Sequence, residues 1–328
     1  MLVDSVEALE SVLGLTPPAM HLKVIDYLDA GALRWIAESP VLFAGIGDAA
    51  MALAGGAPGF IDGDAATLRV PLAAFDSAIC TAPGAPFGGL FLLPGVGETL
   101  RVNGRVESDD GTMLRVAVGE CYGHCAKAMI RSGFWQATPV TAPEDAAEFI
   151  AASRFLALGT TSLRGAADVS PKGDPAGCMA QLDGDTLWFV DRPGNKRIDS
   201  FRNIVGQPRV ALALLVPGAT RVALVRGVAR LITDAAARER FAVRGRTPQL
   251  AIGVAVDSLE LQESAALREL WPVVDGSEIN AAKLFVEHIK LNKTAGAAAM
   301  LARASLAVPG ASALVQAGLD KDYRDNLY

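Results

Sequence analysis

The sequence is poor in several residue types, and each shortage excludes a class of protein. It has four cysteines in 328 residues, too few for the disulfide framework of a small secreted scaffold. It has three histidines, and the run that joins Cys121, His124 and Cys125 matches no zinc-ligand spacing. Lysine and arginine number 30 against 36 acidic residues, so no basic excess is available to neutralise a phosphate backbone. We therefore expect neither a metal site nor a nucleic-acid partner.

Long hydrophobic runs are also missing. The most apolar stretch, residues 210–225, is interrupted by Pro217, Gly218 and Arg221 and is too short for a transmembrane helix. The first 15 residues carry three acidic side chains and lack a basic segment before an apolar one. They predict an amphipathic helix rather than a signal peptide. We expect a cytoplasmic protein with reduced cysteines and no membrane partner.

What the sequence does contain is apolar and repeated. Hydrophobic residues make up 51% and charged residues 20%, which is typical of a globular protein, and the length favours two domains. Short motifs of the first half recur in the same order in the second half, and this order indicates an internal duplication. The pairs are Ile36-Ala-Glu-Ser39 with Ile150-Ala-Ala-Ser153, Asp62-Gly-Asp64 with Asp183-Gly-Asp185, Leu92-Leu-Pro-Gly95 with Leu215-Val-Pro-Gly218, Val116-Ala-Val118 with Val254-Ala-Val256, and Trp135 with Trp271.

The second copy predicts a mainly β domain with small flanking helices. Apolar runs bounded by Gly, Pro and Asp predict strands at 155–160, 177–182, 186–191, 209–216, 221–231 and 251–256, with helices at 196–205 and 234–243. Such short strands favour a closed or nearly closed barrel. We predict N-terminal helices at 1–36, one split barrel at 37–140, a second at 141–272, and a helical extension at 273–328 that has two helices separated at Pro309.

Two polar segments of the second copy combine cations, hydroxyls and glycines. We interpret residues 168–174 and 191–200 as loops at strand ends, with a helix that begins at Lys196. Together they can surround one phosphate, because cations, neutral donors and glycine N–H groups all bind anions. A solvated basic loop is the ordinary alternative. The candidate ligands are Ser170, Lys172, Arg192, Asn195, Lys196 and Arg197.

The first copy carries a different polar set. On a strand, Thr99, Arg101 and Asn103 share one face, and on a following helix Lys127 and Arg131 lie four residues apart. A polar strand face beside a basic helix face suits the polar edge of a heterocycle. Ordinary barrel exterior and helix surface are the alternatives.

These segments resemble the pyridoxamine 5′-phosphate oxidase-related, FMN-binding split-barrel family, and especially its bacterial branch. The resemblance rests on residues 168–178 and 191–204 of the second copy and on 98–105 and 124–135 of the first, and it covers roughly residues 20 to 272. Members are typically homodimers that bind FMN at the interface. The resemblance implies a phosphate and ribityl side formed by Ser170, Lys172, Asp191, Arg192, Asn195, Lys196 and Arg197, and a ring side formed by Thr99, Arg101, Lys127 and Arg131.

Each copy departs from the family pattern where the other keeps it. The first copy has no cation in its second loop, residues 72–80, and a shortened first loop. The second copy has Leu224 in the place of Arg101, and residues 262–265 replace the helix that holds Lys127. We therefore predict one composite FMN site between the copies, in a pseudo-dimeric monomer or a homodimer.

The predicted function is an FMN-dependent oxidoreductase that acts on a small organic substrate, because the cofactor supplies redox chemistry and the protein supplies binding and orientation. One alternative is a non-catalytic binding or sensor protein for flavin, haem or a deazaflavin. The other is a scaffold in which both sites are lost. No catalytic acid or base is identified, although His124 lies near the predicted ring side. The extension is expected to cap the lost site, to cover the retained one, or to contact another chain.

Overall fold

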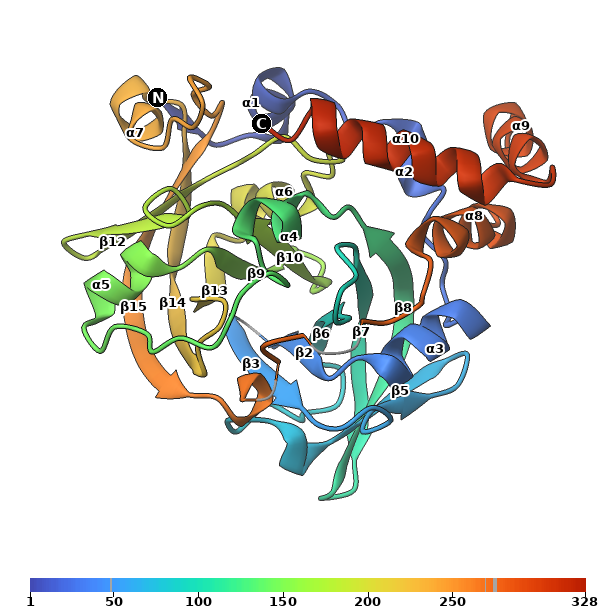
Figure 1. Ribbon diagram of the computed structural model, residues 1–328, viewed down its shortest axis with the longest axis horizontal. Helices are drawn as coiled ribbons and strands as arrows, with labels where there is room; N and C mark the ends of the chain where they lie inside the picture. Colours follow the sequence, from blue (N-terminus) through green and yellow to red (C-terminus); the bar gives the residue numbers. More distant parts are fainter. Residues whose placement is uncertain (48, 269, 274–275) are drawn as a thin grey trace.

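The protein is mostly β, with two antiparallel sheets flanked by helices (Figure 1). The structure, a computed structural model, describes residues 1–47, 49–268, 270–273 and 276–328. The first sheet has the strands β2 (Val41–Ile46), β3 (Ala50–Gly55), β4 (Asp62–Gly63), β5 (Thr67–Pro71), β6 (Pro86–Leu92), β7 (Thr99–Asp109) and β8 (Met113–His124). The second has β9 (Phe155–Thr161), β10 (Ala167–Gly173), β11 (Ala180–Asp183), β12 (Thr186–Val190), β13 (Arg209–Leu215), β14 (Arg221–Ile232) and β15 (Ala251–Glu263), and β1 (Leu2–Val3) pairs with β14.

The two sheets have the same topology. The first follows the order β3-β2-β6-β7-β8-β5-β4 and the second the order β10-β9-β13-β14-β15-β12-β11. Each strand of the first order corresponds to the strand seven places later in the chain. This shared order supports the internal duplication that the repeated motifs predict, and the predicted fold class, two tandem split barrels with flanking helices, is confirmed.

A matching β-bulge occurs in the long hairpin of each sheet. The register of β7 shifts at Gly104, and that of β14 shifts at Gly227. A Cβ atom on Gly104 would lie 2.1 Å from the carbonyl oxygen of Ala117, and one on Gly227 would lie 2.2 Å from that of Ala255. Both bulges therefore require glycine, and each glycine lies ten residues after the proline of a repeated motif, Pro94 or Pro217.

The helices lie outside the sheets. They are α1 (Val6–Leu13), α2 (Pro18–His21), α3 (Ala30–Glu38), α4 (Lys127–Ser132), α5 (Ala146–Ala152), α6 (Asp199–Gly206), α7 (Ala235–Glu239), α8 (Ala281–Leu291), α9 (Ala297–Leu306) and α10 (Ala311–Asp325). Several begin at an Asp, Asn or Ser that accepts a hydrogen bond from a backbone N–H of the first turn, as Asp29 does for α3. None of the helices in the described ranges has the length and apolar character to cross a membrane.

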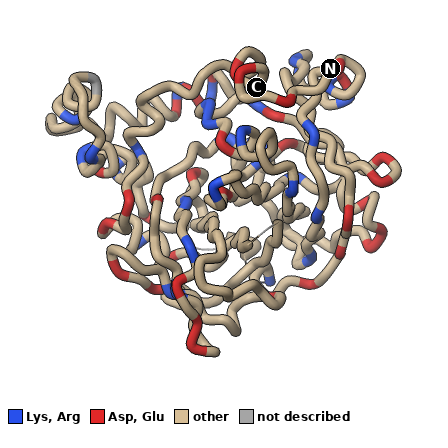
Figure 2. Tube along the Cα trace, turned by 180° about the vertical axis from the view of Figure 1, so that it is seen from behind, with Lys and Arg blue, Asp and Glu red and all other residues tan. Residues whose placement is uncertain are grey.

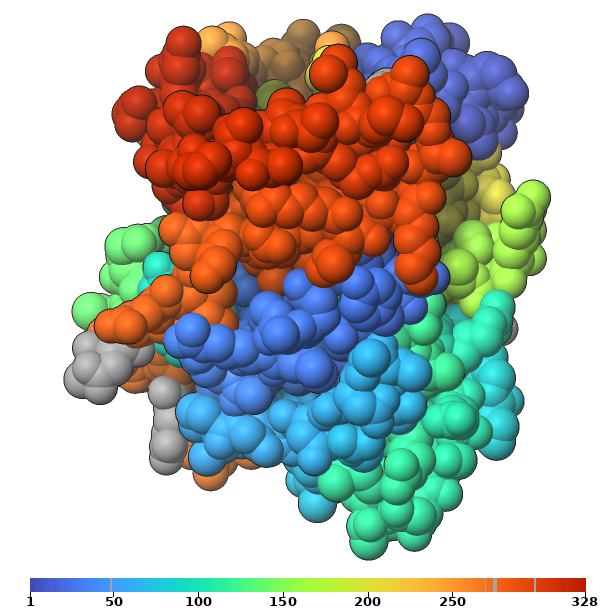
Figure 3. Space-filling view, turned by 90° about the vertical axis from the view of Figure 1, so that its right-hand side faces the viewer, coloured from blue at the N-terminus to red at the C-terminus, as the bar shows by residue number. Residues whose placement is uncertain are grey.

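The helical extension packs against the first half and returns toward the start of the chain. Both ends of the chain lie on the same side of the molecule (Figure 2). Phe285 of α8 belongs to the same buried cluster as Trp35 of α3, and Figure 3 shows the extension, in orange and red, directly over this N-terminal segment in blue. The extension forms three helices where the sequence predicted two, because Gly296, with a φ of 119°, separates α8 from α9.

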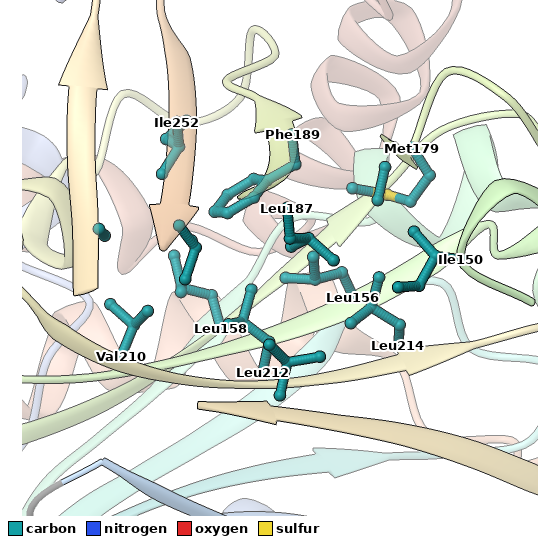
Figure 4. Close-up of a cluster of buried hydrophobic side chains, with 14 of the residues drawn as sticks. Ile150, Leu156, Leu158, Met179, Leu187, Phe189, Val210, Leu212, Leu214 and Ile252 are labelled. Carbon is teal, nitrogen blue, oxygen red and sulfur yellow. The ribbon is translucent and has the colours of Figure 1, made fainter. Parts of the chain in front are cut away.

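The core consists of one large cluster inside each barrel, a third between them, and a small fourth one formed by Val190, Phe241 and Ala251. In the second barrel, Leu158 of β9 and Leu212 of β13 lie side by side on neighbouring strands and pack in one cluster with Leu156 and with Phe189 of β12 (Figure 4). The third cluster takes side chains from both halves, including both repeated tryptophans, Trp135 and Trp271; its other large members are Phe43, Leu90, Leu92, Phe134, Phe155 and Leu215. The barrels thus share an interface that is as apolar as a domain core.

The contacts across this interface are reciprocal. Gly173 in β10 packs on Ala128 of α4, and Gly55 in β3 packs on Ala266 of the short helix at Ala265–Leu267. Gly173 ends β10 and Gly55 ends β3, which are corresponding strands of the two sheets. Ala128 follows β8 and Ala266 follows β15, which also correspond. Such paired contacts are what a twofold axis between two identical subunits produces. The chain is therefore built as a dimer of barrels within one polypeptide.

Replacing Gly173 with alanine is expected to destabilise the protein by about 1–3 kcal/mol, because the new methyl group overpacks the interface. Its Cβ would lie 1.9 Å from the backbone oxygen of Ala128, and a backbone atom cannot rotate away. Urea unfolding followed by tryptophan fluorescence measures the change. Gly119→Ala on exposed β8 is the control, since its Cβ would meet nothing closer than 3.7 Å. A Gly173→Ala midpoint equal to that of the control would contradict the close contact.

The secondary structure differs from the sequence prediction at functional segments. Residues 167–173, which include Pro171, form β10, whereas the sequence interpretation placed a strand-end loop at 168–174. β10 lies at the edge of its sheet, where the missing N–H of proline is tolerated. Helix α6 begins at Asp199 rather than Lys196, since Lys196 has a left-handed φ of 57°. β15 extends to Glu263, and α7 is shorter than predicted. The predicted domain boundaries remain predictions.

Candidate functional site

A cavity of about 480 Å³ opens where the two barrels meet. The second half contributes β10, the loop 190–198 and residues 246–249 to its wall. The first half contributes the end of β8 and the start of α4, and residues 12–14 and Tyr328 complete it. Its volume lies in the range of small-molecule and cofactor sites. Because both halves belong to one chain, the cavity needs no second chain to be complete.

Most of the predicted ligands line this cavity. The residues that do so are Arg131, Ser170, Lys172, Asp191, Arg192, Asn195, Lys196 and Arg197. Thr99, Arg101 and Lys127 are buried behind the wall instead. Arg101 and Lys127 form ion pairs with other side chains of the protein. The Thr99 hydroxyl has no hydrogen-bond partner among the described residues. The structure brings the two predicted sides together, and their role in binding a cofactor remains a prediction.

Arg101 links the two halves through a fully buried network. Its Nη1 donates to Asp168 Oδ1 at 2.6 Å and to the Tyr122 hydroxyl at 3.0 Å, and its Nη2 donates to Ser170 Oγ at 2.8 Å. Ser200 Oγ donates to the other oxygen of Asp168 at 2.7 Å. Burial alone would raise the pKa of Asp168, but Arg101 and these hydroxyls outweigh it and hold that pKa below its usual value. This pair fixes β10, and with it the cavity wall, against β7 of the other half.

Arg197 lines the cavity and carries one guanidinium nitrogen that has no hydrogen-bond partner among the described residues. Its Nη2 lies 2.8 Å from Asp199 Oδ2, and its guanidinium stacks 4.1 Å from the centre of the Tyr122 ring. Its Nη1 is buried and has no hydrogen-bond partner among the described residues. Buried donors are nearly always paired in native proteins, so an unpaired guanidinium nitrogen indicates a missing partner. An anionic oxygen fits this position best.

Lys172 is a second cation without a close partner. Its Nζ lies 3.7 Å from Asp191 Oδ1, beyond hydrogen-bond distance, and 4.4 Å from the centre of the Phe201 ring. Burial lowers the pKa of Lys172 and raises that of Asp191, since the surroundings disfavour both charges. An added anion beside Lys172 would offset this desolvation. Lys196 is exposed at the rim.

Two further arginines hold the walls in place. Arg192 donates to Asp174 Oδ2 at 2.6 Å and to the carbonyl oxygen of Phe241 at 2.8 Å. Arg131 on α4 donates to the carbonyl oxygens of Gly173 and Pro193, so it joins β10 to the loop 190–198. Their donors are largely used by the protein itself. Both positions were predicted as ligands, and here they organise the site.

His124 and Cys125 form the wall nearest to α4. Burial, followed by the positive charges of Arg101, Lys172 and Arg197, lowers the pKa of His124 well below its usual value, so its imidazole is neutral. The Cys125 sulfur lies 3.9 Å from His124 Nδ1, a long contact for an activated thiol. Within the described ranges, no group of three or more His, Cys, Asp or Glu side chains is placed to hold a metal ion.

The position related by the duplication holds a much smaller cavity, of about 100 Å³. There Ala50 takes the place of Asp168 in the ladder, and Leu224 takes that of Arg101. Gln262 corresponds to His124. The smaller cavity has therefore lost both the buried ion pair and the cations of the larger one, and the two halves differ as the sequence departures predicted.

Some residues of the larger site were missed by sequence reasoning. Tyr122 contacts both Arg101 and Arg197, and Ser200 supports Asp168. A signal for Tyr122 existed, because it lies in the same strand as His124, two residues away. Tyr328 and residues 246–249 carried no such signal, since only the folded chain brings them to the cavity.

Two split barrels that enclose a cation-lined cavity at their junction define the class of this protein as a tandem split-barrel protein. The family model described as "Pyridoxamine 5'-phosphate oxidase" matches residues 142–268. Those residues thus form a pyridoxamine 5′-phosphate oxidase-related domain, which confirms the resemblance for the second half. The first half is related to it by its identical strand order.

No curated protein matches the chain. Similar solved structures each cover about one barrel. A histidine-to-alanine variant of HupZ from Group A Streptococcus is 15% identical and covers 37% of this chain and 100% of its own, with a TM-score of 0.30. An F420 reductase is 21% identical, with coverages of 36% and 98% and a TM-score of 0.28. HutZ, a heme storage protein from Vibrio cholerae, is 11% identical, with coverages of 35% and 90% and a TM-score of 0.24.

Proposed function

We propose that the chain binds one FMN in the larger cavity and works as an FMN-dependent oxidoreductase on a small organic substrate. The observation that carries the proposal is the contrast between the two related cavities. The cavity of about 480 Å³ is lined by six cations, Arg131, Lys172, Arg192, Lys196, Arg197 and Arg246, whereas Arg226 is the cation among the described residues that line the cavity of about 100 Å³. Cations gathered in one cavity repel one another and are costly to desolvate, so their retention on one side favours an anionic ligand there.

Each wall has a distinct part in this proposal. Lys172 and the free nitrogen of Arg197 hold the phosphate, with Lys196 at the rim. Asn195 Oδ1 accepts from the Arg197 backbone N–H at 3.0 Å and so keeps the loop in shape. Arg101 is engaged with Asp168, so it positions β10 instead of donating to the ring. His124, Cys125 and α4 line the opposite part of the wall and would hold the ring side.

FMN, when bound, supplies hydride and electron transfer. The protein's own residues bind and orient it and exclude water from the cavity. His124, held neutral by burial and by nearby cations, has a free ring nitrogen to accept or pass a proton at the ring side.

A haem-binding protein is the second candidate, and a specific observation favours it. A neutral histidine on a cavity wall is a suitable axial ligand for haem iron, and His124 meets this description. Among the similar structures, HutZ is named as a heme storage protein, although the likeness itself is limited to one barrel. A non-catalytic flavin or deazaflavin sensor differs from the first proposal only in the absence of turnover.

The visible spectrum of the purified protein distinguishes these candidates. We expect absorption bands at about 370 and about 450 nm. We also expect mass spectrometry to identify FMN in the material that heating releases from the protein. A Soret band that His124→Ala abolishes would replace the flavin proposal with haem. A colourless protein that takes up neither FMN nor haemin would contradict both. Turnover with reduced and oxidised FMN across small donors and acceptors then separates an enzyme from a sensor.

A further inference from the structure

The last helix of the extension is tied to the segment that begins α4 beside the larger cavity. In Figure 1, α10 runs along the same side of the molecule as α1 and α2. Asp322 Oδ2 lies 2.9 Å from Lys127 Nζ, which is otherwise buried in α4. The Tyr323 hydroxyl donates to Glu98 Oε1 at 2.8 Å and accepts from the backbone N–H of Ala126 at 3.1 Å. The last turn of α10 is thus bound to the start of α4, through Ala126 and Lys127, and to Glu98.

The residues after α10 continue into the site. Arg131 Nη1 donates to the carbonyl oxygen of Leu327 at 2.7 Å. The Tyr328 ring lines the cavity, with the guanidinium groups of Arg131, Arg192 and Arg244 at 5.3 to 5.9 Å from its centre. Arg246 donates to the carbonyl oxygen of Tyr328. Arg131, Arg192 and Arg246 line the cavity, so the segment shares these contacts with the ligand space.

Apolar packing holds α10 only weakly. Within α10, every residue of which is described, Ala311 is the buried one, and Leu314 is 72% exposed. Leu319 packs partly against the core of the first half. The helix begins after Gly310, whose φ of 83° marks a sharp change of direction. A segment with few buried apolar contacts and polar ties at one end opens at low free-energy cost.

We propose that α10 and residues 326–328 form a lid over the cavity, latched by the Tyr323–Glu98 and Asp322–Lys127 contacts, and that ligand exchange requires this latch to break. Tyr328 is the residue of this segment that lines the cavity of about 480 Å³, so the segment borders the site without filling it. The link to cofactor exchange rests on the proposed function. The opening of the lid does not, and it can be measured without any cofactor.

Cys125 reports lid opening directly. It lines the cavity, and its neighbour Ala126 bonds to Tyr323. In a Cys80→Ser, Cys178→Ser background, Cys125 and the fully buried Cys121 are the remaining thiols. We would follow the labelling of Cys125 by Ellman's reagent in this background, alone and with Tyr323→Phe plus Asp322→Asn. The loss of a hydrogen bond and an ion pair is expected to speed labelling about tenfold.

Asp325→Asn is the matched control, because Asp325 lies in the same helical turn and is exposed; it is expected to label at the parent rate. Reaction of a second thiol per chain would mean that Cys121 has become exposed and that the double variant has unfolded. The single variant Tyr323→Phe would then be used in its place. Equal rates in the parent and the folded latch variant would overturn the lid. Added FMN is expected to slow labelling in every variant, and to dissociate faster from the latch variant in stopped-flow fluorescence. Faster labelling without any effect of FMN would support the lid and contradict the proposed cofactor.

Discussion

Replacing Arg101 with leucine is expected to lower the free energy of unfolding by about 3–5 kcal/mol, the usual effect of removing one partner of a buried ion pair. The guanidinium and the Asp168 carboxylate are 2% and 6% exposed and lie 2.6 Å apart. Without Arg101, the carboxylate stays buried with hydroxyl donors alone. The strand β10 would lose its tie to β7, and the two halves would lose their central polar contact.

The chain itself contains the compensated form of this change. At the related position of the smaller cavity, Leu224 and Ala50 stand where Arg101 and Asp168 do. The double variant Arg101→Leu, Asp168→Ala copies that arrangement, and we expect it to regain most of the lost stability, because no charge remains buried alone. Chemical denaturation of both variants gives the coupling free energy.

Two further measurements sharpen this test. Arg115→Leu removes an exposed arginine from β8 and is expected to change stability by no more than about 0.5 kcal/mol. The pKa of Asp168 is held low, so its stabilisation is present above its usual pKa and lost as the pH falls through the folded value. In Arg101→Leu, burial raises that pKa instead, and the deficit of the variant should shrink on acidification. A constant deficit, or a double variant less stable than the single one, would argue against a buried ion pair as the cause.

The repeats and turns made much of the fold predictable. Strands such as β12 and β14 begin at the predicted residues because Gly, Pro or Asp turns bound their apolar runs. The prediction failed at β10, where residues 168–174 were interpreted as a loop because they carry cations, hydroxyls and glycines, and at Lys196, whose left-handed backbone delays α6. Both failures fall on the candidate site, where local propensity gives way to the geometry of a binding wall.

The gathering of the cations was predictable, but their individual roles were not. The polar segments of both halves meet at one cavity, as the complementary losses predicted. Whether an arginine is free or engaged depends on partners far along the chain. Arg101 contacts Asp168 of the other half, and Glu98 contacts Tyr323, which lies 225 residues away. Neither contact leaves a local pattern in the sequence, so the lid and the buried pair appear only in the folded chain.

Lys172→Met is expected to weaken FMN binding about 100-fold, the effect of losing about 3 kcal/mol from one charge-assisted contact to a phosphate. Methionine keeps the apolar stem that packs near Phe201 and removes only the charge. Since burial already disfavours the Lys172 charge in the empty protein, the variant should unfold at the same or a higher denaturant concentration than the parent. A variant that binds FMN more weakly but is as stable as the parent would show that Lys172 contacts the ligand and does not hold the fold together.

Arg197→Met should weaken FMN binding by a similar factor, because it removes the unpaired nitrogen at the cavity. Arg226→Met is the matched control: Arg226 lines the smaller cavity, where no ligand is proposed, and its loss should leave the affinity unchanged. Titration of the apoprotein with FMN, followed by flavin fluorescence, gives both the affinity and the stoichiometry. One FMN per chain that depends on Lys172 and Arg197, and not on Arg226, is the result that a single composite site requires. Two FMN per chain, or equal losses in all three variants, would show that the smaller cavity still binds and that the two halves have not divided their roles.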